Sequence, residues 1–430
     1  MFTKKHKPNR LIQPVITGCL LFLSVISFAQ SSNTLTIMQC YELAKANYPL
    51  AKQMALIEKT KEYSIENISK GWLPQLSVNG QGTYQSAVTQ IPISLPNVSI
   101  PVLSRDQYKA YGEVYQPLTD GYTIQQQKQL ATANAATEQQ KLEVELFKLK
   151  ERINQIFFGI LLIDAQVQQT VLLKKDIQSG LEKINASIAN GTALKSSADI
   201  LQAELLKTDQ RSIELKASRK GYADMLAVFI NQPVNENTQF IPPAAPTITA
   251  GINRPELHLY EVQKNSFAVQ DKLIKAKNLP RVGLFAQGGY GRPGLNMLSN
   301  EFAGYYIGGL KLNWNFTGFY TAKKEKAILK INQATIDVQK ETFLLNTNLV
   351  LSQQNSELLK FQELIDTDKE IIRLREKIKQ TSNSQLENGT LTSLDYLTYV
   401  NAEDQARQNM LLHQVQLLLA QYNYQTTSGN

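Results

Sequence analysis

The chain contains the stretch Leu73-Pro74-Gln75-Leu76, followed by Gly80-Gln81-Gly82-Thr83-Tyr84. It repeats this pattern 206 residues later, as Leu279-Pro280-Arg281-Val282 followed by Ala286-Gln287-Gly288-Gly289-Tyr290. A second pair of matching segments, Asn190-Gly191-Thr192 and Asn388-Gly389-Thr390, is offset by 198 residues. Self-similarity at a fixed long spacing indicates a duplicated structural unit. We therefore predict two copies of one α+β unit, each running helix, strand, loop, strand, long helix, turn and helix.

These repeats define the expected boundaries. The first copy covers residues 30–232, with a β-hairpin at 75–117, a long helix at 122–188, a tip turn at 189–197 and a returning helix at 198–230. The second copy covers residues 254–430, with a hairpin at 281–316, a long helix at 319–384, a tip turn at 385–392 and a helix at 393–424. Residues 233–253 contain four prolines, so we assign them as the linker between the copies.

The long helices show the periodicity of a coiled coil. In the first copy, apolar residues follow one another in alternating steps of four and three: Leu142, Leu146, Leu149, Ile153, Ile156, Ile160, Ile163 and Val167. This is heptad spacing, and no proline occurs between Thr123 and Gln232 to interrupt it. A helix over residues 122–188 would extend roughly 100 Å at about 1.5 Å per residue. Such a helix must bury its apolar seam against its neighbours.

The hairpins show the alternation of outer-membrane strands. From Leu76 to Tyr84 every second residue is apolar or glycine and the residues between are polar, and residues 306–316 repeat this pattern. Segments of about ten residues with one apolar face, and with aromatic residues toward the ends, are typical of transmembrane β-strands. A surface hairpin of a soluble sheet would show the same alternation, so both interpretations remain open on this pattern alone.

A membrane location for these strands requires more than one chain. Four strands cannot close a barrel, since outer-membrane barrels begin at about eight, and an open sheet would leave backbone groups unsatisfied in lipid. Two chains would supply eight strands with a filled interior, and three would supply twelve with room for a pore. The predicted fold class is therefore mainly α with a small transmembrane β part, built from tandem coiled-coil helices and two β-hairpins.

Composition excludes several classes of function. Of 430 residues, 43% are hydrophobic and 19% are charged, which is ordinary for a folded protein. The net charge of +8 includes four charges from Lys4, Lys5, Lys7 and Arg10, and the dispersed remainder is not typical of nucleic-acid binding. The three His and two Cys form no metal-binding spacing, and no nucleophile or dinucleotide motif stands out. We expect no enzyme activity, no cofactor and no metal site.

The first 29 residues have the pattern of a secretory signal peptide. A basic start precedes an apolar run from Leu11 to Phe28, and Ser27-Phe28-Ala29 suits cleavage after Ala29. A lipoprotein signal is the alternative, because Ile16-Thr17-Gly18-Cys19 resembles a lipobox. Cleavage after Ala29 would leave Cys40 as the single cysteine, which we interpret as a buried structural thiol. We expect an exported protein that crosses no bilayer as a helix.

The sequence resembles the TolC family of outer-membrane efflux proteins over nearly the whole mature chain. Leu35-Thr36-Ile37 and Ala44-Lys45-Ala46-Asn47-Tyr48-Pro49 look like the family's first helix, and Arg254-Pro255-Glu256-Leu257 looks like the start of its second copy. The resemblance implies a homotrimer, with a 12-stranded β-barrel in the cell outer membrane and an α-helical barrel extending into the periplasm. It also implies a periplasmic adaptor (membrane fusion protein) that links this duct to an inner-membrane RND or ABC-type transporter.

The resemblance assigns roles to both tip turns and to two acidic residues that follow them. In the family, the glycine turns present the surface that the adaptor contacts. This surface corresponds here to Asn190, Gly191 and Thr192, and to Asn388, Gly389 and Thr390. These residues could equally serve only as sharp turns.

The family places an acidic residue at the periplasmic entrance, six positions after the turn glycine, where Asp395 stands. Asp199 is the counterpart in the first copy, although it lies eight positions after Gly191. Helix capping is the alternative role for both aspartates. Thr398 and Leu391 stand where some family members carry charged residues. Any gate that is held closed by charge interactions would therefore have fewer of them here.

The function expected from these features is the passive exit duct of a tripartite efflux pump or a type I secretion system. A periplasmic coiled-coil adaptor or spacer is the alternative, because adaptors also carry long helical hairpins. One hairpin and a lipoyl-like β domain would be expected of an adaptor, whereas this chain shows two matched strand pairs and a duplication.

Overall fold

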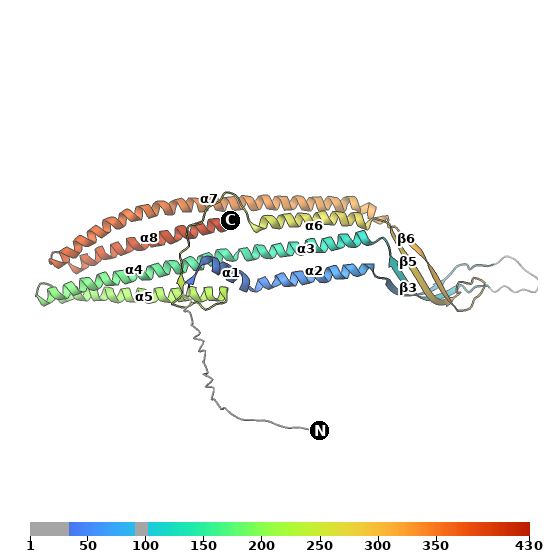
Figure 1. The fold of residues 1–430 in the computed structure, drawn as a ribbon, viewed down its shortest axis with the longest axis horizontal. Coiled ribbons are helices and arrows are strands. Elements are labelled where there is room, and N and C mark those ends of the chain that lie inside the picture. The colour runs from blue at the N-terminus through green and yellow to red at the C-terminus, as the bar shows by residue number, and fades with distance from the viewer. Residues whose placement is uncertain (1–33, 91–101) are drawn as a thin grey trace, which may run out of the picture.

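The heptad-patterned segments form long helices that lie side by side along most of the molecule (Figure 1). The computed structural model describes residues 34–90 and 102–430. Its α-helices are α1 (Ile37–Asn47), α2 (Gln53–Ser69), α3 (Gly121–Phe147), α4 (Leu149–Ala189), α5 (Lys195–Ile230), α6 (Pro255–Lys277), α7 (Thr317–Glu387) and α8 (Ser393–Ser428). Its strands are β1 (Thr34–Leu35), β2 (Gln75–Tyr84), β3 (Asp106–Pro117), β4 (Gln239–Phe240), β5 (Arg281–Arg292) and β6 (Ala303–Asn313). The expected cleavage after Ala29 and the alternative lipidation at Cys19 lie outside the described residues.

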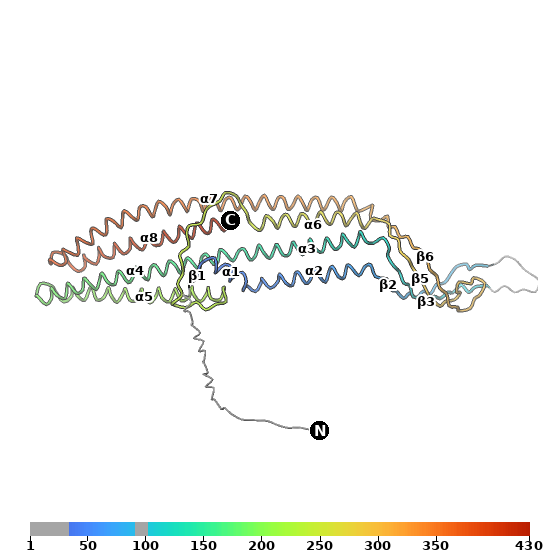
Figure 2. Tube along the Cα trace, viewed as in Figure 1, coloured from blue at the N-terminus to red at the C-terminus, as the bar shows by residue number. Residues whose placement is uncertain are grey.

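The helices form a wall of four neighbours at each end of the molecule. Next to the sheet, contacts run in the order α2, α3, α6 and α7; at the far end they run α5, α4, α8 and α7 (Figure 2). Helix α7 has 71 residues, which corresponds to about 107 Å, and it lies at one border of the wall along its whole length. Helices α3 and α4 are separated by Lys148 alone, whose φ of −62° and ψ of −19° stay near helical values.

Two apolar clusters hold these helices together. The first lies at mid-length and packs Ile153, Ile156 and Ile160 of the heptad seam against α1, α5 and β4. The second lies toward the far turns and joins Ile177 of α4 to α5 and α8. One window within Gly121–Ala189 is long and apolar enough to span a membrane, but half of it is buried in the protein, as expected for a core helix. The seam predicted from sequence is therefore the packing surface.

Cys40 belongs to the first of these clusters. Its side chain is fully buried, and burial raises the pKa of its thiol to about 12. A thiol in this environment stays protonated and unreactive. The interpretation of Cys40 as a structural residue is confirmed.

The two hairpins form one antiparallel sheet in the order β2-β3-β5-β6. Val78 lies opposite Gly112, Gly112 opposite Gly288, and Gly288 opposite Tyr306, so the register runs unbroken across the four strands. Strands β2 and β6 each pair on one side only, which leaves two edges unpaired within the described sheet. The structure is thus mainly helical with two antiparallel hairpins, as the sequence predicts.

One close helix contact depends on a glycine. Gly180 of α4 faces the ring of Tyr396 of α8, which is only 1% exposed and whose hydroxyl donates to the Asp176 carbonyl at 3.2 Å. A Cβ atom at position 180 would lie 2.6 Å from the Tyr396 Cε1 atom. By contrast, a Cβ atom at Gly221 of α5 would meet nothing within 4 Å. Both glycines therefore have helical backbone conformations, but only Gly180 lies against a neighbouring side chain.

We expect Gly180→Ala to destabilise the protein by about 1–3 kcal/mol, because the buried Tyr396 ring has no space to yield. Gly221→Ala is the matched control and should stabilise by roughly 0.5–1 kcal/mol, since it only removes backbone freedom from a helix interior. Midpoints of thermal unfolding in detergent, followed by circular dichroism, measure both effects. Equal midpoints for the two variants would show that the α4–α8 contact tolerates a methyl group and is not tight.

Candidate functional site: an apolar sheet face and two helical tips

One face of the sheet is almost entirely apolar and is exposed. The strand register places alternate residues of all four strands on this face. We call it the apolar face; its large side chains are Leu76, Val78, Tyr84, Tyr108, Val114, Leu284, Tyr290, Tyr306, Leu310 and Leu312. Val78 is 90% exposed and Tyr306 is 85% exposed, although both lie in the middle of regular strands. An exposed apolar surface of this extent indicates contact with lipid or protein.

Charges occur on the apolar face only at its loop end within the described strands. There Arg292 of β5 pairs with Asp106 of β3. The Arg292 guanidinium also lies 5.6 Å from the Tyr108 ring centroid and 5.3 Å from that of Phe302. The Tyr290 and Phe302 rings stack at 5.7 Å. Aromatic residues with paired charges at the end of an apolar strand match the boundary between hydrocarbon and polar headgroups.

The opposite face of the sheet, which we call the polar face, carries most of the polar and charged side chains of the strands, with some apolar side chains such as Phe285 and Ile307 among them. Glu113 of β3 accepts a hydrogen bond from the Gln287 side chain of β5, and it lies 3.5 Å from the Lys311 ammonium of β6. Ser77, Asn79 and Gln81 of β2 lie on the same face by register. A sheet with one apolar and one polar face is suited to separate lipid from water.

The two far turns share one backbone geometry. In the first, the Gly191 amide donates to the Ile188 carbonyl at 3.0 Å and the Thr192 amide to the Ser187 carbonyl at 2.9 Å. In the second, Gly389 donates to Leu386 at 3.2 Å and Thr390 to Gln385 at 2.9 Å. Both pairs form the Schellman motif, which requires a left-handed residue after the helix cap.

Glycine supplies that left-handed conformation in both turns. Gly191 has φ of +74° and Gly389 has φ of +69°, and a Cβ atom at either position would meet nothing within 4 Å. The preceding Asn190 and Asn388 end their helices with nearly identical backbone angles. All six tip residues are exposed, so the structure places the two Asn-Gly-Thr segments together at the end of the molecule away from the sheet (Figure 1).

The two aspartates near the turns differ in position. Residues 190–194 and 388–392 form turns of equal length, so Asp395 is the third residue of α8 whereas Asp199 is the fifth of α5. Ser197 occupies the position equivalent to Asp395. The Asp395 amide donates to the Thr392 hydroxyl at 3.1 Å, and that hydroxyl donates to the Asp395 carboxylate at 2.7 Å. Asp395 therefore takes part in capping while its side chain remains exposed, and Asp199 has no ion pair within the described residues.

A partly buried charge network, which the sequence did not reveal, joins α7 and α8 to α4. The Lys379 ammonium lies 2.6 Å from Asp176 and 3.2 Å from Glu403, a residue 2% exposed. Arg407 pairs with both Glu403 and Glu376. Burial lowers the pKa of Lys379, but its hydrogen bonds and charge interactions with Asp176 and Glu403 outweigh burial and raise that pKa. Lys379 and Asp176 are 203 positions apart in sequence, so no local motif could have indicated that pair.

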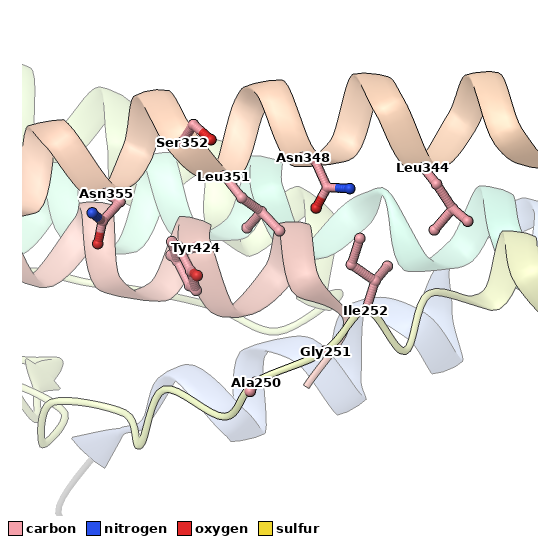
Figure 3. A pocket seen from close by; sticks show the side chains of 9 residues that line it. All are labelled: Ala250, Gly251, Ile252, Leu344, Asn348, Leu351, Ser352, Asn355 and Tyr424. Atoms are coloured by element: carbon pink, nitrogen blue, oxygen red, sulfur yellow. The ribbon is translucent and has the colours of Figure 1, made fainter.

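A surface pocket of about 690 Å³ lies where the linker crosses α7 and α8 (Figure 3). Ala250, Gly251 and Ile252 of the linker face Asn348 and Tyr424, among others. The lining side chains are apolar groups, amides, one serine hydroxyl and one phenol, with no acid–base pair among them. No cluster of three or more metal-binding side chains occurs in residues 34–90 or 102–430. The candidate functional features among the described residues are therefore the apolar face of the sheet and the two tip turns.

Solved outer-membrane channels share this fold. CusC, described as forming a transmembrane channel, superposes with a TM-score of 0.64 at 13% identity, covering 91% of each chain. VceC, an outer membrane protein of Vibrio cholerae, gives 0.61 at 13% identity over 92% of this chain and 96% of that chain. The open state of the MtrE outer membrane channel of Neisseria gonorrhoeae gives 0.63 at 14% identity over 92% and 89%. No protein-family model and no curated protein matches the sequence. The likeness confirms the predicted fold of one chain, with long helices and two antiparallel hairpins.

Proposed function

We propose that the chain is one protomer of a homotrimeric outer-membrane exit duct that conducts cargo passively, without bond chemistry. The observation that carries this proposal is the apolar face: an exposed, regular sheet surface with no charge along its middle, joined directly to long helices, of which α7 alone extends about 107 Å. The sheet would lie in the outer membrane and the helices would extend into the periplasm. An inner-membrane transporter of the RND or ABC type would supply the energy through a periplasmic adaptor.

The borders of the wall favour closure into a ring. Strand β6 and helix α7 form one border, whereas β2, α2 and α5 form the other. Exposed residues of α7 recur every seven positions at Ile331, Val338 and Leu345, which is a second coiled-coil seam with no partner in the described chain. A groove of about 630 Å³ with apolar side chains, including Leu56 and Ile57, lies between α2 and α3 at the other border.

Because the two borders differ, copies would associate head to tail, and such contacts form a closed ring when the rotation closes. Three copies of the four-stranded sheet supply twelve strands, which is wide enough for a pore. The likeness to channels spans both sheet and helices, which favours this duct over the adaptor alternative.

Lipid contact at the apolar face can be tested by adding one charge. Val78→Lys should cost about 2–4 kcal/mol if the side chain faces hydrocarbon, and should cost almost nothing if it faces water. Asn79→Lys is the matched control, because the neighbouring residue lies on the polar face. We expect Val78→Lys to reduce the yield of oligomer in the outer membrane well below that of Asn79→Lys. Equal yields would contradict a lipid-facing sheet.

The tip residues Asn190, Gly191, Thr192, Asn388, Gly389 and Thr390 form the surface that we assign to adaptor docking. Gly191→Val with Gly389→Val should distort both turns, because positive φ costs an L-residue roughly 1–2 kcal/mol at each site. Efflux should fall about tenfold or more, as expected for a loss of about 1.4 kcal/mol in docking. Gly191→Asn with Gly389→Asn is the control, because asparagine tolerates this conformation. Loss of oligomer in the valine variant would show that the turns are structural instead.

The Asp395 carboxylates of three protomers are assigned to a ring at the periplasmic entrance, and Asp199 to a weaker contribution from the first copy. Three like charges about one axis attract multivalent cations. Asp395→Asn should reduce block by trivalent cations in bilayer recordings while keeping an acceptor for the Thr392 hydroxyl. Thr392→Ala removes the cap at a cost of about 1 kcal/mol but keeps the charge, so block should persist. Unchanged block in Asp395→Asn would remove the ring assignment.

A further inference from the structure

We propose that the junction between sheet and helices is a basic collar that binds the anionic phospholipid headgroups of the membrane leaflet facing the helices. This inference rests on the proposed membrane location of the sheet. The junction consists of four segments, residues 69–75, 117–128, 271–282 and 314–326, which lie together where α2, α3, α6 and α7 meet the strands (Figure 1). We call these segments the collar.

Charge is concentrated in the collar. Its four segments contain nine Lys and Arg but three Asp and Glu, a net charge of +6 in each chain. The whole chain carries +8, and residues 1–29 account for +4 of that, so the rest of the protein outside the collar is slightly negative. A trimer would place the collars of its three chains in one plane. This asymmetry was hidden in the sequence, because the four segments are far apart along the chain.

Most of the collar cations are unpaired. Asp271 pairs with Lys275 at 3.0 Å and lies 4.0 Å from Lys326, and Asp120 lies 3.9 Å from Arg281. Five further lysines of the collar are exposed and form no ion pair within the described residues: Lys70, Lys272, Lys277, Lys323 and Lys324. Their charge is therefore available to an external anion.

Aromatic residues mark the same level as a membrane boundary. Trp314, Phe316 and Phe319 form a chain of rings with centroids 4.8 Å and 6.2 Å apart, and each ring is about half exposed. The Trp314 indole donates to the Asn278 carbonyl at 3.1 Å, which fixes the ring at the end of α6. Trp72 packs so closely on Gly121 that a Cβ atom there would lie 2.5 Å from its ring. Tryptophan held at the end of an apolar strand is typical of the lipid–water interface.

The unpaired lysines and the aromatic residues of the collar together indicate what binds there. Lys323 and Lys324 begin one turn after Phe319 on α7, so their ammonium groups lie just beyond the aromatic level on the helix side. Phosphate groups of phospholipids occupy this depth, and lysines near an anionic surface attract them. Charge complementarity therefore favours phosphatidylglycerol and other anionic lipids over zwitterionic ones at the collar.

The chain carries its own probe for this test, because Trp72 and Trp314 are its only two tryptophans and both lie in the collar. The full-length protein is purified from outer membranes and reconstituted in bilayers that contain brominated phosphatidylglycerol or brominated phosphatidylcholine at equal mole fraction. Bromine quenches tryptophan only at contact, so quenching reports the lipid next to the collar. We expect an apparent affinity at least about threefold higher for phosphatidylglycerol. In about 1 M salt, where charges are screened within ~3 Å, the preference should disappear.

In a fourfold variant, Lys70→Gln, Lys277→Gln, Lys323→Gln and Lys324→Gln, the tryptophans should be quenched equally by both lipids. The matched control replaces four exposed, unpaired lysines outside the collar, Lys52, Lys175, Lys216 and Lys377, and should keep the preference. Equal quenching of the unaltered protein by both lipids, or a preference that survives in the collar variant, would overturn the collar. No quenching by either lipid would instead show that the junction is outside the membrane, which contradicts the proposed function itself.

Discussion

The structure depends on one constraint: a four-stranded sheet with an exposed apolar face cannot exist alone in either water or lipid. In water, the face that includes Val78 and Tyr306 would remain unburied. In lipid, the unpaired backbone groups at the outer edges of β2 and β6 would lack partners. Closure with further copies of the chain satisfies both requirements, because neighbouring sheets pair their edges while the apolar surface stays in the membrane.

The helices follow from the same constraint. A ring of sheets has a fixed circumference, and the helices that leave it must fill an equal circumference below. The duplicated chain supplies four helices abreast at each level, with α7 spanning both levels as one border. One border carries the exposed apolar seam of α7 and the other carries the groove between α2 and α3, which includes apolar side chains, so the helical wall is also built to be continued by another copy. The partly buried network of Lys379, Asp176 and Glu403 then fixes the α7–α8 pair against α4 within each protomer.

Much of this fold could be predicted from sequence, because its signals are periodic. Heptad spacing gave the long helices, since Ile153 and Ile160 are buried as the seam requires, and alternation identified the two hairpins. The left-handed turns at Gly191 and Gly389 followed from glycine chemistry. Pairings between distant residues could not be predicted: Lys379 and Asp176 are 203 positions apart and belong to no motif. The spacing of Asp199 from Gly191 suggests two extra residues, but the turns have equal length, and in the fold Ser197 is the equivalent of Asp395.

The most direct measurement of the central claim is the size and location of the assembled protein. The full chain is expressed in a Gram-negative host, and the outer-membrane fraction is run unheated and heated on a denaturing gel. We predict an outer-membrane band near three times the chain mass of 48.3 kDa that collapses to one chain mass on heating. A soluble periplasmic monomer would contradict it, because the apolar sheet face would then have to remain exposed to water in a stable protein.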